Sequence, residues 1–276
     1  MSNDYLAEHT TLGQATENIY TYTPSLLCPI PRTVARQELG LDGLSLPFNG
    51  TDIWTAYEVS WLGQSGKPEI AIAEFKLPAT SANIIESKSF KMYLNSFNLT
   101  RFDSWAEVSE VMTKDLSAAA GAPVWVTLLT PAQMQRAGVT TPKGVCLDDL
   151  DINAEVYMPE PSLLSTLDEV VAEEVYSDLF RSCCPVTGQP DWATVSVIYK
   201  GSKIDHQSLL SYLVSFRDKA EFHEQCAERI FTDINQHCQP QELTVFARFL
   251  RRGGLDINPW RSNVREAPLF QRLSRQ

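Results

Sequence analysis

The stretches PFNGTDIWTAYEVSW, residues 47–61, and PVTGQPDWATVSVIY, residues 185–199, are two copies of one local pattern. Three residue types coincide when the stretches are aligned: Pro47 with Pro185, Gly50 with Gly188, and Trp54 with Trp192. Each stretch then continues as alternating small and bulky residues, which is typical of a strand that leaves a turn. This pattern indicates an internal duplication, and a duplication constrains the whole fold.

A second pair of matching stretches follows in the same order. SFKMYLNSF, residues 89–97, matches SLLSYLVSF, residues 208–216, at its serines, at Tyr-Leu and at the final Phe. Both stretches have helical spacing. The offset between the copies is 138 residues for the turn and 119 for the helix, so the first copy holds about nineteen extra residues, within 63–82.

Each of these helices is followed by a second one with a predicted capping box. The boxes pair Ser104 with Glu107 in the first half and Asp218 with Glu221 in the second. Apolar residues then recur at steps of four along the later helix: Phe222, Cys226, Ile230 and Ile234. This stripe predicts a helix with one buried face.

The expected fold is therefore a duplicated α+β unit. Each half is predicted to run as turn, strand, further strand, helix, helix and strand, with two helices on one face of an antiparallel sheet. The acidic, turn-rich segment 141–161 is the expected connection between the halves. We expect an N-terminal domain over residues 1–160 and a C-terminal domain over residues 161–276.

Charge and hydropathy exclude several classes of protein. The net charge is −11, and the one dense basic cluster, Arg248, Arg251 and Arg252, suits a single phosphate-bearing ligand better than a nucleic acid. No apolar stretch approaches the 18 or so residues of a membrane span. Residues 1–14 contain neither a basic region nor an apolar region of a secretory signal, so we expect a cytoplasmic location.

The cysteines do not form a recognisable metal or disulfide pattern. The six cysteines contain no CxxC pair. His223 with Cys226, or His237 with Cys238, could supply two zinc ligands, but no matching second pair is evident. Most of these cysteines are expected to be small buried hydrophobic residues.

The two copies differ in which polar groups they carry. Cys184 and Asp191 in the second copy align with Leu46 and Ile53 in the first. In front of the matched helix, the first copy has Glu86, Ser87 and Lys88, whereas the second has Asp205, His206 and Gln207. Because each half carries groups that the other lacks, we expect a composite site between the two halves.

The chemistry of such a site is constrained by its residue types. A cysteine attacks as its thiolate, so Cys184 needs a base or a positive neighbour. Asp191 could take the thiol proton and return it, and His223 is a second candidate for proton transfer. Burial of the cysteines in the core and an ordinary, satisfied His223 remain open alternatives.

Common nucleotide and hydrolase motifs are missing from the sequence. There is no GxSxG elbow, no GxGxxG after a strand and no P-loop. The run RRGG, residues 251–254, offers two guanidinium groups for a phosphate and two glycines for close backbone approach. A strand end followed by a hairpin turn explains the same run equally well.

Four stretches together resemble one enzyme family. They are ESKSFKMYLNSFN (86–98), CPVTGQPDW (184–192), FHEQCAERIF (222–231) and RRGGLDINPWRS (251–262). These motifs occur in this order in the long, two-domain form of the 7-cyano-7-deazaguanine reductases (QueF), the nitrile reductases of queuosine biosynthesis. The chain is similar, more distantly, to tunnelling-fold enzymes that act on purines and pterins.

The resemblance implies a reaction and a role for each motif. Cys184 would add to the nitrile carbon and form a covalent thioimide, with Asp191 as proton donor and His223 assisting. The substrate-binding residues implied are Ile85, Glu86, Ser87, His223 and Glu224. The residues implied for NADPH are Ser87, Lys88, Arg252 and Gly253.

The resemblance also implies the partners of the protein. They are NADPH as co-substrate and a free deazapurine base, with no metal, no nucleic acid and no membrane. Duplicated tunnelling-fold units associate to close a barrel, so a homodimer is implied. Cys183 departs from the family pattern; Cys184 is chosen as nucleophile because it adjoins Pro185 and lies seven residues before Asp191.

Two other functions are kept as alternatives. One is a zinc-dependent tunnelling-fold cyclohydrolase acting on a purine or pterin, with zinc held by Cys184, His223 and Cys226. The other is a non-catalytic purine-binding module. A covalent adduct on Cys184 distinguishes the reductase from the binding module, and stoichiometric zinc with activity lost to a chelator identifies the cyclohydrolase.

Overall fold

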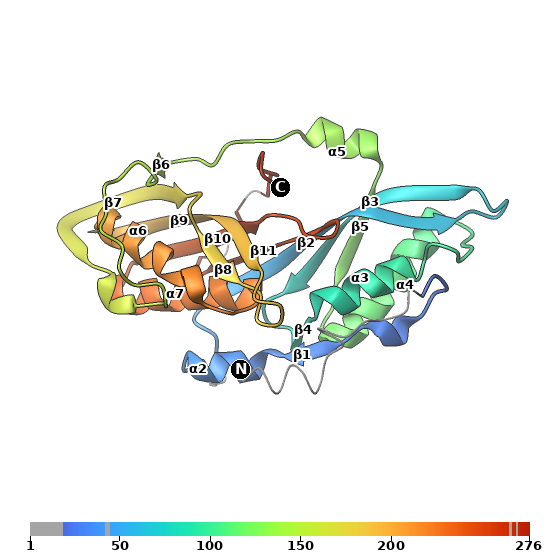
Figure 1. The fold of residues 1–276 in the computed structure, drawn as a ribbon, viewed down its shortest axis with the longest axis horizontal. Helices are drawn as coiled ribbons and strands as arrows, with labels where there is room; N and C mark the ends of the chain where they lie inside the picture. The colour runs from blue at the N-terminus through green and yellow to red at the C-terminus, as the bar shows by residue number, and fades with distance from the viewer. Residues whose placement is uncertain (1–18, 42–44, 265–266, 269) are drawn as a thin grey trace. The chain divides into compact units, whose positions relative to one another are not determined.

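The computed structural model describes residues 19–41, 45–264, 267–268 and 270–276 (Figure 1). Residues 1–14, which are expected to lack a secretory signal, lie outside this described part. Within it, no helix combines the length and the apolar character needed to cross a membrane.

The chain forms two compact units that are not contiguous in sequence. Of the described residues, the first comprises 19–38, 51–138 and 251–257, and the second comprises 39–41, 45–50, 139–250, 258–264, 267–268 and 270–276. Each half of the chain therefore contributes a short segment to the other unit. The domain division at residue 160 remains a prediction about the two halves of the duplication.

The first unit consists of strands and helices in mixed order. Its strands are β1 (Pro29–Pro31), β2 (Asn49–Leu62, from Thr51), β3 (Pro68–Pro78), β4 (Asn83–Ile85) and β5 (Trp125–Leu129). Its helices are η1 (Pro24–Leu26), α2 (Arg32–Glu38), α3 (Ser87–Asn95), α4 (Trp105–Ala120) and α5 (Pro131–Ala137).

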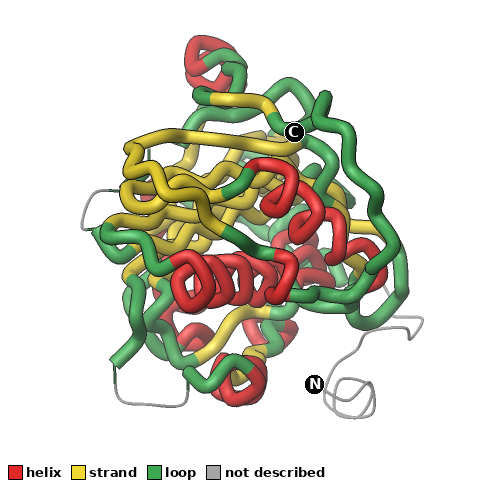
Figure 2. The backbone as a smooth tube through the Cα atoms, turned by 90° about the vertical axis from the view of Figure 1, so that its left-hand side faces the viewer, coloured by secondary structure: helices red, strands yellow, loops and turns green. Residues whose placement is uncertain are grey.

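The core of the first unit lies between its sheet and two helices. The strands are antiparallel in the order β5-β3-β2, and β1 pairs with β4 separately. Buried side chains of β2 and β3, such as Trp54 and Phe75, cluster with Phe90 of α3 and Met112 of α4. Helix α5 lies on the other side of β3 and β5 from α3 and α4 (Figure 1), and Figure 2 shows it at the top of the view.

The second unit also contains both strands and helices, but they follow one another in a different order. Its strands are β6 (Val145–Cys146), β7 (Thr166–Ser177), β8 (Arg181–Cys183), β9 (Pro190–Ile204), β10 (Glu242–Phe249) and β11 (Leu255–Ser262, from Asn258). Its helices are η2 (Pro161–Leu163), α6 (His206–Val214), η3 (Ser215–Asp218) and α7 (His223–Cys238).

The second unit buries one face of its sheet against α7. The strand order is β11-β10-β9-β7-β6, with β8 paired to β9, and all pairs are antiparallel except β6 with β7. Helix α7 packs on β10. Cys226, Ile230 and Ile234 of the stripe are fully buried, as their spacing of four predicts. The expected α+β class, with antiparallel sheets, is confirmed.

Two local expectations are wrong in the second half. No further strand follows β9 before α6; instead β9 pairs with β7, which precedes it in the chain. The first half has its extra strand as β3, inside the insertion of residues 63–82. Helix α7 also begins later than the Asp218–Glu221 box predicts, because Gln225 Oε1 accepts the N–H of Phe222 at 3.2 Å and caps the helix there.

The capping prediction for α4 holds at its main contact. Ser104 Oγ accepts the Glu107 N–H at 3.2 Å, and the Glu107 carboxylate accepts the N–H of Asp103 at 2.6 Å. The reciprocal bond therefore goes to the residue before the N-cap rather than to the N-cap itself. The box satisfies two backbone donors that would otherwise have no helical partner.

The aligned glycines of the two copies serve different physical needs. Gly188 has φ of +66°, which favours glycine because a side chain is strained there. Gly50 has no such angle, but a Cβ at this position would lie 2.2 Å from the carbonyl oxygen of Trp260. One glycine is therefore required by a turn and the other by close backbone packing.

Candidate functional site

Cys184 and Asp191 lie on the same face of a β-hairpin. The register of β8 with β9 places Ser182 opposite Asp191, and the Cys184 N–H donates to the Gln189 carbonyl at 2.8 Å, which continues the ladder by one residue. Side chains alternate along a strand, so Cys184 and Ser182 point to one face, which Asp191 shares as the partner of Ser182. The hairpin therefore makes Cys184 and Asp191 diagonal neighbours.

Cys183 points to the opposite face of this hairpin. Its N–H donates to the Lys219 carbonyl at 2.8 Å, and its carbonyl accepts the Glu221 N–H at 3.1 Å. Its Sγ lies 3.6 Å from the Arg217 carbonyl and 3.7 Å from Arg181 Nη2. The adjacent cysteines thus have separate surroundings, and Cys184 is the one that shares a face with the carboxylate.

His223 brings a second proton-carrying group to Asp191. Its Nε2 lies 3.4 Å from Asp191 Oδ2, and its ring stacks on Phe249 with 3.8 Å between centroids and 4° between planes. The His223 Nδ1 is buried and has no hydrogen-bond partner among the described residues. His223 is the first residue of α7, so the helix fixes its backbone. Asp191 and His223 can therefore hold a proton at Asp191 Oδ2 or His223 Nε2 and pass it between these two atoms.

The first turn of α7 also carries Glu224, which is only 3% exposed. A carboxylate in this position interacts favourably with the N-terminal end of the helix dipole. Glu224 therefore offers buried acceptor oxygens, which suits recognition of N–H groups on a flat heterocycle.

A buried ion-pair network fastens the Cys183–Cys184 segment to α7. Arg229 donates from Nε to Glu221 Oε1 at 2.8 Å and also reaches this carboxylate through Nη2. Burial by itself would lower the pKa of Arg229, but the hydrogen bonds to Glu221 raise it above its usual range. Because the Glu221 N–H bonds to Cys183, this pair connects the helix to the hairpin.

In the first unit, the residues expected to bind substrate surround the start of α3. Glu86 is the N-cap of this helix and accepts the Lys88 N–H at 2.6 Å and the Ser89 N–H at 2.7 Å. Burial raises the pKa of the Glu86 carboxyl, and these two N–H bonds oppose that rise. The side chain of Ile85 is part of the hydrophobic core, so only its backbone is suited to contact a ligand.

The two segments expected to bind NADPH lie together in the first unit. A Cβ at Gly253 would be 3.4 Å from Lys91 Cδ, and Lys91 follows Lys88 by one helical turn of α3. The turn 251–254 is held by a bond from the Tyr57 N–H to the Gly254 carbonyl at 2.9 Å and by Arg251 stacked over the Tyr57 ring. The sequence indicated both segments but not Lys91.

The buried thiols of α7 differ from the others in acidity. Burial raises the pKa of Cys226 well above its usual value, with a further contribution from Glu221, and raises the pKa of Cys238 to about 11. Within the described part of the chain, no group of three or more His, Cys, Asp and Glu side chains is placed to hold a metal ion, so the zinc site considered for Cys184, His223 and Cys226 has no support.

These pKa shifts predict selective alkylation of the native protein at pH 8. Cys226 and Cys238 should react with iodoacetamide about 100-fold more slowly than the exposed Cys146, because their thiolate fraction is lower and they are buried. Peptide mass spectrometry after timed quenching measures the rates. All six cysteines should react at similar rates in denaturant, and equal rates in the native protein would contradict the buried environment.

The structure therefore gathers most of the residues singled out from sequence into two groups. The first unit holds Ile85, Glu86, Ser87, Lys88, Arg252 and Gly253, and the second holds Cys184, Asp191, His223 and Glu224. Phe249 was missed, because a strand phenylalanine gives no local signal for a contact with His223. Lys91 was missed because only the fold places it beside Gly253.

Comparisons with known proteins give one family. Residues 19–128 match the family model "Nitrile reductase, 7-cyano-7-deazaguanine-reductase N-term", and residues 190–268 match the model "QueF-like protein". The NADPH-dependent 7-cyano-7-deazaguanine reductase of Dechloromonas aromatica (strain RCB) is 57% identical over 252 residues, which are 91% of this chain and 89% of that protein.

A solved structure also matches part of the chain. It is the archaeosine synthase QueF-Like in the apo form, 18% identical, covering 36% of this chain and 99% of that chain with a TM-score of 0.31. The family follows instead from the sequence identity and coverage of the Dechloromonas protein. This chain belongs to the family of NADPH-dependent 7-cyano-7-deazaguanine reductases.

Proposed function

We propose that this protein reduces the nitrile of 7-cyano-7-deazaguanine to the aminomethyl group of 7-aminomethyl-7-deazaguanine, with NADPH as reductant, in queuosine biosynthesis. Family membership gives the reaction. The observation that carries the mechanism is the hairpin register that puts Cys184 and Asp191 on one face, with His223 Nε2 3.4 Å from Asp191.

The first step is covalent and moves one proton. The Cys184 sulfur bonds to the nitrile carbon, one π bond of the nitrile breaks, and the thiol proton goes to the nitrile nitrogen, which gives a thioimide. Asp191 takes and delivers this proton, and His223 holds Asp191 in place and exchanges protons with it. Glu224 accepts N–H groups of the deazaguanine and orients the nitrile towards Cys184.

The reduction to the amine requires two hydrides and two protons. Two equivalents of NADPH supply the two hydrides, one from each equivalent. The residues of this chain supply protons to the nitrogen. Between the two reductions the C–S bond breaks as a C=N bond forms, and one proton passes from the nitrogen to the sulfur, so that Cys184 leaves as a thiol and the nucleophile is regenerated. Asp191 serves the first of these protonations, because the nitrogen stays beside it while the carbon is bound to Cys184, and the second protonation follows release of the sulfur.

The first unit has the chemistry to hold the phosphates of NADPH. Lys88 and Lys91 on α3 and Arg252 in the neighbouring turn offer positive charge, and Ser87 offers a hydroxyl group at the first position of the helix. Gly253 has φ of +60° and no side chain to occupy the space beside Lys91. Planar guanidinium groups match the geometry of a phosphate, so Arg252 suits the 2′-phosphate.

Replacing Arg252 by alanine should raise the KM for NADPH by about 10- to 100-fold, because a charge-assisted hydrogen bond to phosphate is lost. The KM for NADH, which lacks the 2′-phosphate, should change far less. Lys114→Ala is the matched control, since it removes an exposed positive charge of the same unit that is not assigned to the cofactor. Steady-state kinetics with both nucleotides measure the effect, and an equal rise for NADPH and NADH would refute the assignment.

The proposal extends to partners and location. The substrate is a free base and not a nucleic acid, which agrees with the net charge of −11. The enzyme acts in the cytoplasm as a homodimer. Strand β5 supports the dimer, because among the described strands it pairs only with β3, and Trp125 on it is 58% exposed. Sedimentation velocity tests the dimer, and a monomer at micromolar concentration would exclude it.

The direct test of the function is NADPH oxidation with the purified nitrile as substrate. Two NADPH should be consumed for each amine formed, and mass spectrometry of enzyme incubated with the nitrile alone should find the mass of the nitrile added to the peptide that contains Cys184. Absence of turnover would reject the function. Turnover without an adduct, or an adduct on Cys183, would reject only the covalent mechanism.

A further inference from the structure

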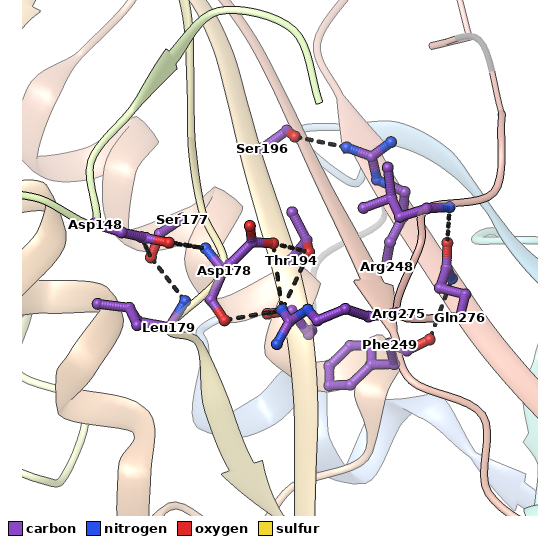
Figure 3. A network of polar contacts seen from close by, with 12 residues as sticks. Asp148, Ser177, Asp178, Leu179, Thr194, Ser196, Arg248, Phe249, Arg275 and Gln276 are labelled. Atoms are coloured by element: carbon purple, nitrogen blue, oxygen red, sulfur yellow. Dashed lines mark hydrogen bonds and ion pairs between the residues drawn. The ribbon is translucent and has the colours of Figure 1, made fainter. Parts of the chain in front are cut away.

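The segment from Arg272 to Gln276 contacts the start of β9, the strand that carries Asp191, and the end of β10, where Phe249 stacks on His223. Figure 3 shows Arg275 beside Asp178 and Thr194, and Gln276 beside Phe249. All of these residues belong to the second unit. Two hydrogen bonds lie within the segment. The Leu273 N–H donates to Gln276 Oε1 at 3.0 Å, and Arg272 Nε donates to the Gln276 carbonyl at 2.9 Å.

Gln276 makes a buried polar contact with the end of β10. Its Nε2 donates to the Phe249 carbonyl at 3.1 Å and also to Asn258 Oδ1. Gln276 is 3% exposed, and both Phe249 and Asn258 are fully buried. A buried carbonyl that loses its donor is costly, so this amide restrains the backbone of Phe249.

Arg275 makes the corresponding contact with β9. Its Nη2 lies within hydrogen-bond distance of the Ala193 carbonyl at 3.2 Å, Thr194 Oγ1 at 3.3 Å and the Asp178 carbonyl at 2.8 Å. Thr194 Oγ1 in turn donates to the Asp178 carboxylate. One guanidinium group thus joins the start of β9 to the loop that follows β7.

The two contacts meet at one level of the sheet. Ala193 is paired with Phe249 in the register of β9 with β10. Arg275 and Gln276 therefore donate to the carbonyls of two residues that are paired with each other in the sheet. Asp191 lies two residues before Ala193 on the same strand. Phe249 is the last residue of β10, and its ring stacks on His223. The segment therefore restrains the strand that carries the acid and the ring that supports the histidine.

The orientation of His223 depends on that ring more than on hydrogen bonds. Its Nδ1 has no hydrogen-bond partner in the part of the chain that the structure describes, and its Nε2 is 3.4 Å from Asp191 Oδ2, longer than an ordinary N–H···O bond of about 2.9 Å. The parallel stack on Phe249, with 3.8 Å between ring centroids and 4° between planes, restrains the imidazole plane. A shift of Phe249 would rotate this plane and change the distance to Asp191.

We propose that Arg275 and Gln276 are positioning residues for proton transfer, acting through β9 on Asp191 and through Phe249 on His223. This inference rests on the proposed function, because it assigns the two residues to the protonation of the nitrile nitrogen. Neither residue touches the substrate. They keep the proton donor and its histidine at a fixed separation while Cys184 attacks.

The test compares two variants with a matched control. Gln276→Met keeps the length of the side chain and removes the donor to Phe249, and Arg275→Ala removes the contact with Ala193. Gln271→Ala, a change at the exposed residue directly before this segment, is the control. Thioimide formation is followed by rapid quench and mass spectrometry without NADPH, in H2O and D2O. Nitrile affinity is measured separately by calorimetry in a Cys184→Ala background.

Gln276→Met and Arg275→Ala should each slow thioimide formation about tenfold or more, because a misplacement near 1 Å can cost about 100-fold. The solvent isotope effect on thioimide formation should rise, since proton transfer then limits this step more strongly. The nitrile affinity should stay within twofold of the value for the Cys184→Ala protein without the second change. Gln271→Ala should match the wild-type protein in each measurement.

Several results would overturn the inference. Both variants could form the thioimide at the wild-type rate, or rate and nitrile affinity could fall together with an unchanged isotope effect, as expected for general loosening. Phe249→Leu, which keeps apolar volume and removes the flat ring, must show the same rise in isotope effect. A wild-type protein that forms no adduct rejects the proposed function as well, whereas the first two results reject only the role of the segment.

Discussion

Cys184→Ala is expected to lose nitrile reduction by about 10⁴-fold or more, because loss of a nucleophile removes the covalent route and not one contact within it. No thioimide should form on any cysteine. The variant should still bind the nitrile, since Glu224 and His223 remain in place. Coupled NADPH oxidation and intact-protein mass spectrometry measure the two effects.

Cys183→Ala is the matched control for this substitution. It removes the same side chain one residue earlier, but from the opposite face of the hairpin, where Sγ lies near the Arg217 carbonyl. Its backbone bonds to Lys219 and Glu221 do not depend on the side chain. The control should keep activity within a few-fold of the wild-type protein. Retained activity in Cys184→Ala would remove the basis of the mechanism.

Asp191→Asn is expected to lower kcat by about 10²- to 10⁴-fold, the usual contribution of a positioned general acid or base. The amide keeps the size of the side chain but cannot take up and return the proton. Thioimide formation should slow, because the nitrile nitrogen must be protonated as sulfur adds. The KM for the nitrile should change little, since Asp191 is not assigned to recognition of the base.

The control for this substitution is Asp205→Asn in the same unit. Asp205 is the N-cap of α6 and accepts the Ser208 N–H at 2.8 Å, a role that asparagine performs about equally well. It should leave kcat and thermal stability unchanged. If Asp191→Asn instead unfolds the protein or raises only the KM, then Asp191 supports the hairpin or binds the base and is not the proton donor.

Local features of the fold were readable from sequence because a few neighbouring residues determine them. The steps of four from Cys226 to Ile234 require only that one face of a helix be apolar, and that face is buried. Ser104 caps α4 because its hydroxyl reaches the N–H of Glu107, three residues along the chain. The Asp218 box was wrong because Gln225 competes for the same helix start, and local sequence does not decide between two plausible caps.

Part of the candidate site could also be predicted from sequence, because it depends on residues that are close together in the chain. The asymmetry between the aligned copies singled out Cys184 and Asp191, and a hairpin between them is a short-range structure. The choice between Cys183 and Cys184 by contrast rested on the neighbouring Pro185 and on the family pattern. The register of β8 with β9 adds the physical reason, because a shift of one residue would exchange the faces of the two thiols.

The sequence by itself determined the duplicated α+β pattern, the separate polar groups of the two copies and the family of the protein. Only the tertiary structure decided that β9 pairs with β7, that Lys91 lies beside Gly253, and that Phe249 connects His223 to Gln276. The physical reason is distance along the chain. Helical period, caps and turns depend on residues within a few positions, whereas strand partners and ring contacts depend on how the whole sheet packs.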